Sequence, residues 1–398
     1  MSSSEDSESY VSSSSDDKCE HTDNLDLKNN ILKKYNIISE IGRGGDAIVW
    51  LGYNIEDQKY YAIKVYGPDD YKKTLEEIAF LKKLPKDYNV FNHLKDDFVE
   101  EINKKKYVCA VFELHSCDLD RVLRKSNLED GLSIPIVKKI MVQLLTAIKY
   151  MHKNIKAFHC DIKTDNILLK GINNYDLNII QQYDSMNFSK LYQNERKNGK
   201  IKDKTNIRKT IHKNLCDKII FQDKSEKNNI IVNNELSTSL SDFGTFCYEG
   251  ESFNSEFGTR YYRAPEIILK GDISYGVDIW ACGCVFYELL TGVLLFDPSK
   301  TSKYSRDDFH LLKMNEICGN FPLKFIKKTK YWKDYFNKNG ELLMCKPNKI
   351  NMKELLKKHN VVDCLDDIIE LLEGMLQINP NNRFTVDDCL NHTFLSNC

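Results

Sequence analysis

The sequence predicts an α+β protein in which a small, sheet-rich part is followed by a larger, mainly helical part. Between residues 35 and 114, short β-branched and aromatic stretches alternate with turns, as in a compact sheet. From Pro135 onward, apolar residues recur at helical spacing. The 398 residues are too many for one small core and favour two packed lobes with extensions.

The amino-acid composition indicates where the protein is located and which classes of partner it can bind. No apolar run approaches the roughly 18 residues of a membrane span. The formal net charge is −1 and no dense Lys/Arg block occurs, so we expect neither a membrane nor a direct nucleic-acid partner. The start lacks the features of a secretory signal, and the 13 cysteines indicate reduced thiols. We expect an intracellular monomer, in the cytoplasm, the nucleus or both.

The N-terminal residues 1–33 differ in composition from the rest. Nine serines occupy the first 15 positions, and residues 1–30 carry eight acids against two lysines. Such a segment cannot bury enough apolar surface to offset the entropy of ordering. It is predicted to be a disordered, acidic, Ser-rich tail.

The sheet-rich lobe is expected over residues 35–113. Three strands are predicted between Tyr35 and Tyr66, separated by turns at 42–45 and 56–58. A helix is predicted over 71–84, and two more strands over 98–102 and 106–114. The apolar stripe of that helix is predicted to consist of Leu75, Ile78, Leu81 and Leu84.

The helical lobe is expected over residues 114–395. Its first long helix is predicted at 135–152, and later helices at 277–291, 308–318 and 362–376. Residues 171–237 interrupt this pattern, because they are polar and rich in Asn and Lys. They are predicted to be a mostly loop-like insertion. It is either a docking or localisation element or a loop without function.

A glycine-rich turn between two predicted strands is the first candidate for phosphate binding. Glycines let the backbone approach phosphate oxygens and direct its N–H groups at them. A glycine turn is also common in plain hairpins, so it is weak evidence by itself. The candidate nucleotide-binding residues here are Ile41, Gly42, Arg43, Gly44, Gly45, Asp46, Ala47, Ile48 and Val49.

A single lysine in an apolar strand strengthens the phosphate-binding hypothesis. Lys64 lies within Tyr61-Ala62-Ile63-Lys64-Val65, where a charge is costly unless it is paired. Glu77 on the next predicted helix is its expected partner. The alternative is an unpaired lysine that extends its charged end to the surface.

Three further motifs make the resemblance to the eukaryotic protein kinase family plain. His159-Cys160-Asp161 is followed four residues later by Asn166, which resembles the catalytic loop of that family. Ser241-Asp242-Phe243-Gly244 resembles its metal-binding motif, and Gly258 through Ala264-Pro265-Glu266 resembles the end of its activation segment. The resemblance covers about residues 35–395 and implies the bilobal protein kinase fold.

The resemblance assigns a role to each matching residue. Asp161 is implied as the catalytic base, and Lys163 as the lysine that neutralises charge on the γ-phosphate, which is typical of serine/threonine kinases. Asn166 and Asp242 are implied to hold Mg²⁺, so the implied cofactors are ATP and Mg²⁺. The adenine is implied to bind the backbone of Glu113 and Leu114. The implied supporting residues are Glu77, Thr259, Glu266, Asp278 and Arg383.

Within the family, the chain most resembles SR-protein kinases of the CMGC group. Thr259-Arg260-Tyr261-Tyr262-Arg263 is similar to that group, and 76 positions separate Asn166 from Asp242, where SR-protein kinases also carry a spacer. The implied partners are protein substrates, with Arg/Ser-rich segments as the hypothesis. Asp307, Asp308 and Glu316 are the acids that the sequence proposes for docking them.

Other readings stay open at this point. A pseudokinase would have lost the lysine, the base or a metal ligand, and none is lost here. A small-molecule phosphotransferase would usually lack the stretch Gly258–Glu266. Cys160 stands where the family usually has arginine, so we expect activity without phosphorylation of the activation segment. A nucleophilic or redox role for Cys160 is the alternative.

Overall fold

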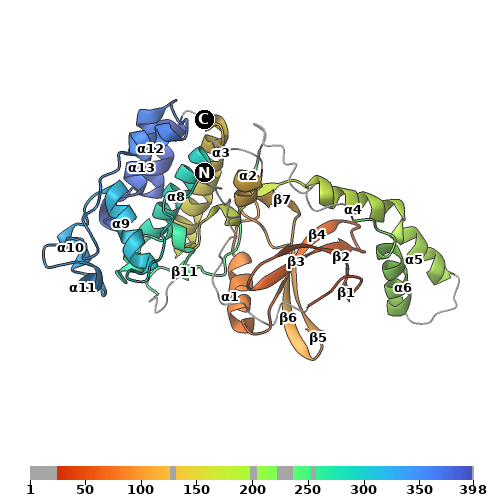
Figure 1. Ribbon diagram of the computed structural model, residues 1–398. Coiled ribbons are helices and arrows are strands. Elements are labelled where there is room, and N and C mark those ends of the chain that lie inside the picture. Colours follow the sequence, from red (N-terminus) through yellow and green to blue (C-terminus); the bar gives the residue numbers. More distant parts are fainter. Residues whose placement is uncertain (1–24, 126–130, 198–203, 222–235, 252–256, 397–398) are drawn as a thin grey trace, which may run out of the picture. The chain divides into compact units, whose positions relative to one another are not determined.

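The computed structural model describes residues 25–125, 131–197, 204–221, 236–251 and 257–396 (Figure 1). The chain divides into two compact units. Unit 1 consists of Met1–Ile78, Leu94–Glu113 and Ile180–Ile220, and unit 2 consists of Ala79–His93, Leu114–Ile179 and Phe221–Cys398. Part of the predicted insertion therefore groups with the sheet-rich unit.

Unit 1 is built on a six-stranded sheet in the order β1-β2-β3-β4-β6-β5, in which all neighbours are antiparallel. Its strands are β1 (Ile31–Leu32), β2 (Tyr35–Arg43), β3 (Ala47–Asn54), β4 (Tyr60–Tyr66), β5 (Asp96–Ile102) and β6 (Lys105–Phe112). Trp50, Ile63 and Cys109 lie in the core of this sheet. The alternation of apolar residues located β2 to β6 correctly.

Helix α1 (Tyr71–Leu81) follows β4, as the sequence predicts. Ile78 and Leu81 of the predicted stripe are buried, but Leu75 is 40% exposed. Thr74 and Phe80 are buried in addition. The predicted stripe was therefore wrong at Leu75, because Phe80, which is larger, defines the buried side of the helix.

The predicted disordered tail is wrong for its described part, residues 25–33. Leu25, Leu27 and Leu32 are buried and belong to the core of unit 1. The short strand β1 pairs with β2, with Leu32 opposite Tyr35. The sequence analysis missed these three leucines because the average composition of residues 1–33 is polar. Residues 1–24 lie outside the described part of the chain.

The described part of the insertion is mainly helical, which corrects the expectation of a mostly loop-like segment. It forms α4 (Asn174–Ser185), α5 (Phe188–Lys197) and α6 (Lys204–Cys216). In α6 the side chains at Ile207, Ile211 and Leu215 are buried. In Figure 1, α6 lies beside β1 and β2 of unit 1. These helices contain few apolar residues, so the sequence signal was weak, and packing against the sheet stabilises them.

A buried chain of hydrogen bonds joins the insertion to β2. The Asn36 side-chain amide donates to the Tyr183 hydroxyl at 3.0 Å, and that hydroxyl lies 3.0 Å from Nδ1 of His212. Nε2 of His212 lies 2.8 Å from the Ile37 carbonyl oxygen, which only accepts, so Nε2 carries the proton. Arg208 donates to the Asn36 amide oxygen at 2.8 Å. Every member of this chain has a partner only while His212 is neutral.

This geometry predicts a loss of stability in mild acid. Burial lowers the pKa of His212 to about 4, whereas the unfolded chain has an ordinary histidine pKa near 6.5. The unfolded state therefore binds more protons between these values, and stability falls as the pH drops from about 6.5 to 4, by roughly 3 kcal/mol at most. Chemical denaturation of the protein and of His212→Gln at several pH values measures this. The slope should be shallower in the variant, and equal slopes would contradict the prediction.

Unit 2 is mainly helical. Its helices include α2 (Leu119–Lys125), α3 (Ile134–Tyr150), α7 (Pro265–Ile268), α8 (Gly276–Thr291), α9 (Arg306–Cys318), α10 (Leu323–Ile326), α11 (Trp332–Tyr335), α12 (Met352–Lys358), α13 (Leu365–Met375), α14 (Val386–Asn391) and α15 (Thr393–Ser396). The four helices predicted from periodicity correspond to α3, α8, α9 and α13. Helix α8 is buried from Val277 to Thr291. No helix in the described ranges has both the length and the hydropathy of a membrane span.

Two small sheets of unit 2 border the segments that carry Asp161 and Asp242. One has the order β10-β9-β7, with β7 (His115–Asp118), β9 (Ile167–Lys170) and β10 (Thr238–Leu240). The other pairs β8 (Ala157–Phe158) with β11 (Cys247–Tyr248). Strand β8 ends just before His159, β9 begins just after Asn166, and β10 ends two residues before Asp242.

Candidate active site

The loop that carries Asp161 is held by a carboxylate beneath it. Asp278 is buried on α8 and accepts hydrogen bonds from the backbone N–H groups of His159 and Cys160, both at 2.9 Å. Its other contact is Nε2 of His152, at 2.8 Å. Burial by itself would raise the pKa of Asp278, but the bond from His152 and the nearby donors outweigh it and lower the pKa. An ionised Asp278 therefore fixes the backbone just before Asp161.

The Asp161 carboxylate is oriented by three neighbours. Thr259 donates to Oδ1 through its backbone N–H at 2.7 Å and its hydroxyl at 2.8 Å. Lys163 Nζ lies 3.2 Å from Oδ2 and donates to the Thr259 hydroxyl at 3.0 Å. The Asn166 amide donates to the Asp161 carbonyl oxygen at 2.8 Å. Four residues implied by the motifs thus form one connected group.

Electrostatics keep Lys163 charged in this group. Burial would lower the pKa of its ammonium, but the negative charge of Asp161 and, after it, of Asp165 raises the pKa above the ordinary value. The positively charged Lys163 ammonium therefore lies beside the Asp161 carboxylate. Such a pair can receive a proton on one side and stabilise an anion on the other.

Asn166 and Asp242 are brought together although 76 positions separate them. Strands β9 and β10 pair so that Ile167 lies opposite Leu240. Ser241 then donates to the Asn166 carbonyl oxygen through its N–H at 2.9 Å and its hydroxyl at 3.0 Å. Asp242 follows with an exposed side chain and a φ of 60°. Sequence analysis did not single out Ser241, because only the strand pairing reveals its contact with Asn166.

Phe243 anchors the segment after Asp242 in the core of unit 2. Its ring is completely buried and lies within 5.4 Å of the Phe80 ring and 5.1 Å of the His159 ring, between centroids. Nε2 of His159 also lies 3.1 Å from the Ser241 carbonyl oxygen. These contacts fix the position of Asp242 relative to the loop that carries Asp161.

Unit 1 holds the glycine-rich residues and Lys64 in one sheet. Val49 of β3 pairs with Lys64 of β4 on one side and with Gly42 of β2 on the other. The turn at the end of the hairpin is closed by a bond from the Gly44 N–H to the Ala47 carbonyl oxygen at 2.9 Å. The glycine-rich segment and the lysine are therefore neighbours, as phosphate binding requires.

Lys64 forms the ion pair that the sequence predicted. Its Nζ lies 3.7 Å from Oε1 of Glu77, which is almost fully buried on α1. The Tyr66 hydroxyl donates to the same oxygen at 2.9 Å, and the Lys64 ammonium lies 4.6 Å from the Tyr66 ring centroid. A lysine held by one carboxylate and one ring is positioned and not merely extended into solvent. Glu113, implied in adenine binding, ends unit 1, and its side chain pairs with Lys95 at 2.6 Å.

The comparisons with known proteins agree with this arrangement. The family model described as protein kinase domain matches residues 35–182 and 205–395. The chain belongs to the protein kinase family. The gap in the match, 183–204, lies within the insertion. This kinase is 30% identical to "Serine/threonine-protein kinase SRPK" of Physarum polycephalum, over 91% of the chain and 86% of that protein.

Two further relatives point the same way. "Putative serine/threonine-protein kinase L205" of Acanthamoeba polyphaga mimivirus is 25% identical, over 91% of the chain and 87% of that protein. "Protein kinase dsk1" of Schizosaccharomyces pombe is 25% identical, over 88% of the chain and 78% of that protein. The kinase is thus a serine/threonine protein kinase similar to SR-protein kinases, and it transfers the γ-phosphate of ATP to protein hydroxyls.

The acids that the sequence proposed for docking basic substrates already have partners in this kinase. Asp307 pairs with Arg260, and Asp308 accepts from the Ser305 N–H at 2.8 Å as part of the cap of α9. Glu316 accepts from the Asn348 N–H at 3.1 Å. These acids therefore hold α9 and its surroundings in place.

Cys160 is enclosed by apolar groups. It is buried in a cluster with Phe158 and Cys247, against which Phe257 and Tyr275 pack. Burial raises the pKa of its thiol well above the ordinary value, and the nearby Asp278 adds to this. A buried, protonated thiol is a poor nucleophile, so the geometry argues against a nucleophilic or redox role.

The same cluster predicts activity without phosphorylation of the activation segment. Cys160 brings no positive charge beside Asp161, and Arg263, which lines the same small cavity, donates to the Gly258 carbonyl oxygen at 2.8 Å, so no arginine of the loop itself needs a phosphate. Alanine at both Ser252 and Ser255, which lie outside the described residues, should retain more than half of the peptide kinase activity. Initial rates of both proteins, after phosphatase treatment, measure this. A loss of tenfold or more in the double variant would contradict it.

Proposed function

We propose that this kinase acts on basic, Arg/Ser-rich protein segments. The supporting observation is a group of crowded acids near Asp161 and Lys163, made of Asp118, Asp120, Asp165 and Glu288. Burial raises the pKa of Asp165, and the charges of Asp120 and Asp118 raise it further. Burial likewise raises the pKa of Glu288 to about 7. A substrate cation would relieve this repulsion.

Cations of the chain already lie at this group. Arg124 pairs with Asp120, and its Nη2 lies 3.4 Å from Oε1 of Glu288. The Tyr262 hydroxyl, four residues before Glu266 on the chain, donates to the other Glu288 oxygen at 2.6 Å. Arg121 and Lys163 also lower the pKa of Asp118 and Asp165, so three cations of the chain face four carboxylates. The remaining negative charge suits a guanidinium brought by a substrate.

The mechanism assigns the chain's residues as follows. Asp161 orients the substrate hydroxyl and accepts its proton, because Thr259 and Lys163 hold both of its oxygens. Lys163 neutralises charge on the transferred phosphoryl group. Lys64 and the N–H groups of the glycine-rich turn bind the phosphates of ATP, and the backbone of Glu113 and Leu114 binds adenine.

Asn166 and Asp242 fit the magnesium site that the family uses. Mg²⁺ is usually held by one or two carboxylates together with substrate phosphates, and it keeps several waters. Here the bonds from Ser241 to the Asn166 carbonyl oxygen bring the residue that carries an exposed carboxylate close to the residue that carries the amide. When bound, the metal shields the negative charge of the phosphates.

The test compares peptides of different charge. An Arg/Ser-repeat peptide should be phosphorylated with a kcat/KM at least tenfold above that of an acidic or proline-directed serine peptide. This preference should weaken as salt rises from about 50 to about 500 mM, because added salt screens the attraction between exposed charges. Steady-state rates with radiolabelled ATP measure both. Equal rates for the three peptides would refute the substrate proposal.

A variant separates the substrate class from catalysis itself. Asp120→Asn removes one of the crowded acids, so KM for the Arg/Ser peptide should rise several-fold while kcat stays close to the original value. Asp272→Asn, an exposed carboxylate elsewhere in unit 2, is the matched control and should change neither. A fall in kcat alone for Asp120→Asn would argue against recognition of the substrate cation at this group.

A further inference from the structure

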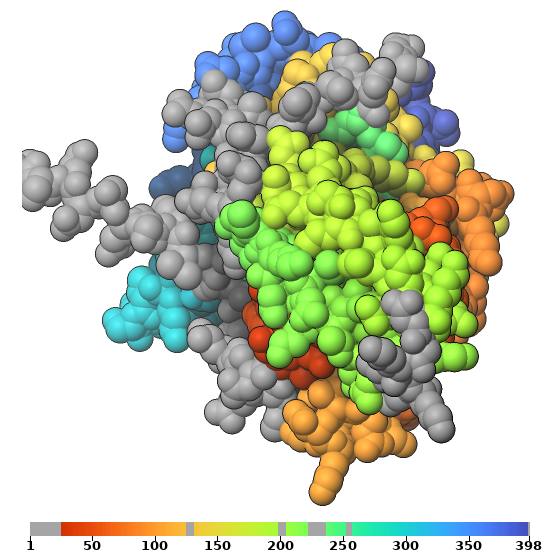
Figure 2. All heavy atoms as spheres, turned by 90° about the vertical axis from the view of Figure 1, so that its right-hand side faces the viewer, coloured from red at the N-terminus to blue at the C-terminus, as the bar shows by residue number. Residues whose placement is uncertain are grey.

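The outer side of the inserted helices is strongly basic. Between residues 186 and 220 the chain has ten basic side chains and three acidic ones. The inner side of α6 packs against the sheet of unit 1, so most of these charges lie on the outside; Figure 2 looks onto the insertion, drawn in green. The basic face consists of the exposed residues Lys190, Arg196, Lys197, Lys204, Lys209, Lys213 and Lys218.

The charges of this basic face are not neutralised within the described part of the chain. In the described residues, no ion pair joins Lys204, Lys213 or Lys218 to an acid. The charge of Lys209 lowers the pKa of Glu100, but burial of Glu100 raises that pKa by more. A surface with this excess of positive charge attracts a negatively charged segment.

An acidic segment of the same chain, residues 1–24, is attached to unit 1 close to the basic face. Residues 1–24 carry seven acids and one lysine. The chain that follows is fixed to unit 1 through the buried Leu25 and Leu27. It also contacts α6 directly, because Arg208 donates to the Lys33 carbonyl oxygen at 2.9 Å. Lys28 lies close enough to Cys216, at the end of α6, to lower the pKa of its thiol, although burial of the thiol outweighs this.

We propose that residues 1–24 bind the basic face of α5 and α6 within the same molecule. A chain of this length reaches at most roughly 80 Å when extended, and α6 is only about 20 Å long, so the whole basic face is within reach. The attachment point beside α6 gives the acidic tail a millimolar effective concentration at that surface. The bound tail covers the basic face and competes with other polyanions for it.

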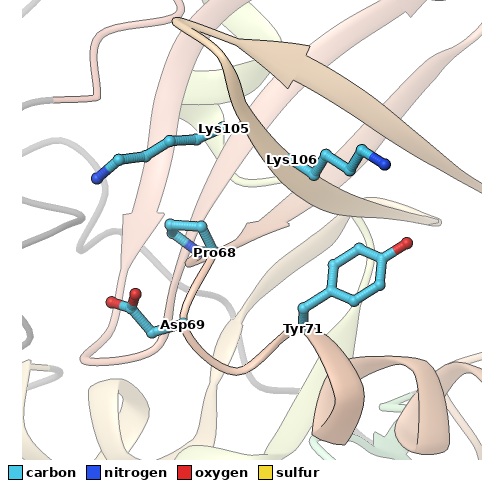
Figure 3. A pocket seen from close by; sticks show the side chains of 5 residues that line it. All are labelled: Pro68, Asp69, Tyr71, Lys105 and Lys106. Carbon is cyan, nitrogen blue, oxygen red and sulfur yellow. The ribbon is translucent and has the colours of Figure 1, made fainter.

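A second lysine-rich region of unit 1 fits the acidic tail less well. Lys105 and Lys106 on the β5–β6 hairpin border a hollow of about 310 Å³ that is also lined by Pro68, Asp69 and Tyr71 (Figure 3). The Asp69 carboxylate at this hollow opposes an anionic chain. The hairpin therefore offers a matched control with exposed lysines on the same unit.

Carbodiimide crosslinking of the full-length kinase tests the proposal, because this reagent joins a carboxylate to a lysine only where the two are in contact. Mass spectrometry should find crosslinks from the acids of residues 1–24 to lysines of the basic face, and these should disappear at high salt. The double variant Lys209→Glu/Lys213→Glu should reduce them at least fivefold. The control Lys105→Glu/Lys106→Glu should leave them unchanged, and the melting temperature should stay the same in both variants.

Three outcomes would overturn the proposal. Tail crosslinks that go mainly to the β5–β6 hairpin or to unit 2, or no tail crosslinks at low salt, would show that the basic face does not bind the tail. Crosslinks that join an isotopically labelled copy to an unlabelled copy would show a contact between molecules. None of these outcomes depends on kinase activity, so they bear on the proposed docking alone.

Discussion

Asp161→Asn is expected to lower the rate of phosphoryl transfer by about 10²- to 10⁴-fold, the usual contribution of a general base. The amide keeps the shape of the carboxylate and still accepts the two bonds from Thr259 at Oδ1. It cannot accept the proton of the substrate hydroxyl, and it loses the ion pair with Lys163. Single-turnover phosphorylation of a serine peptide measures the effect.

Two controls separate this loss from damage to the fold. The melting temperature of Asp161→Asn should stay close to that of the original protein, and calorimetry should show that ATP still binds with Mg²⁺. Asp272→Asn removes an exposed carboxylate of the same unit and should leave the rate unchanged. If Asp161→Asn kept more than a tenth of the original rate, Asp161 would not be the base.

Glu266→Ala is expected to destabilise unit 2 by about 3–5 kcal/mol, because it leaves a charged guanidinium buried without its partner. Arg383 contacts both Glu266 oxygens, at 2.7 and 3.1 Å, and both side chains are fully buried. The guanidinium also donates to the Gly276 carbonyl oxygen at 2.6 Å and lies 5.1 Å from the Trp280 ring centroid. Differential scanning calorimetry should show a lower midpoint for the transition of this unit.

A double variant and an exposed pair provide the comparison. Glu266→Ala/Arg383→Met removes both charges and should cost less than Glu266→Ala alone, since no unpaired charge stays buried. The pair between Lys353 and Asp366 lies 3.2 Å apart with side chains that are 48% and 90% exposed. Lys353→Ala should therefore change stability by less than about 1 kcal/mol. Equal effects of Glu266→Ala and Lys353→Ala would contradict the role given to burial.

Much of the candidate site was predictable because its motifs are short. Eight consecutive positions contain His159, Asp161, Lys163 and Asn166. Such short spacing can be recognised in the sequence without knowing how the rest of the chain folds. The pair of Lys64 and Glu77 was predictable for another reason, since a lysine in an apolar strand needs a carboxylate. Contacts such as that of Ser241 with Asn166 were not predictable, because they depend on which strands pair.

Helices with few apolar residues were the main failure of the sequence analysis. Residues 171–237 are polar on average, and the helices Phe188–Lys197 and Lys204–Cys216 contain few apolar side chains. Their stability depends on Tyr183 and His212, whose partners lie in β2, far away along the chain. The three leucines between Leu25 and Leu32 escaped notice for the same reason, because their core is formed by other strands.

By itself the sequence determined the family, the order of the lobes and the candidate residues for proton and phosphate chemistry, because these depend on residue types at short, constant spacing. Only the tertiary structure decided which acids are bonded within the chain and which of them lie together. It showed Asp307, Asp308 and Glu316 already bonded within the chain, and it gathered Asp120, Asp165 and Glu288 near the catalytic loop. The availability of a charge depends on its neighbours in space, which residue order does not reveal.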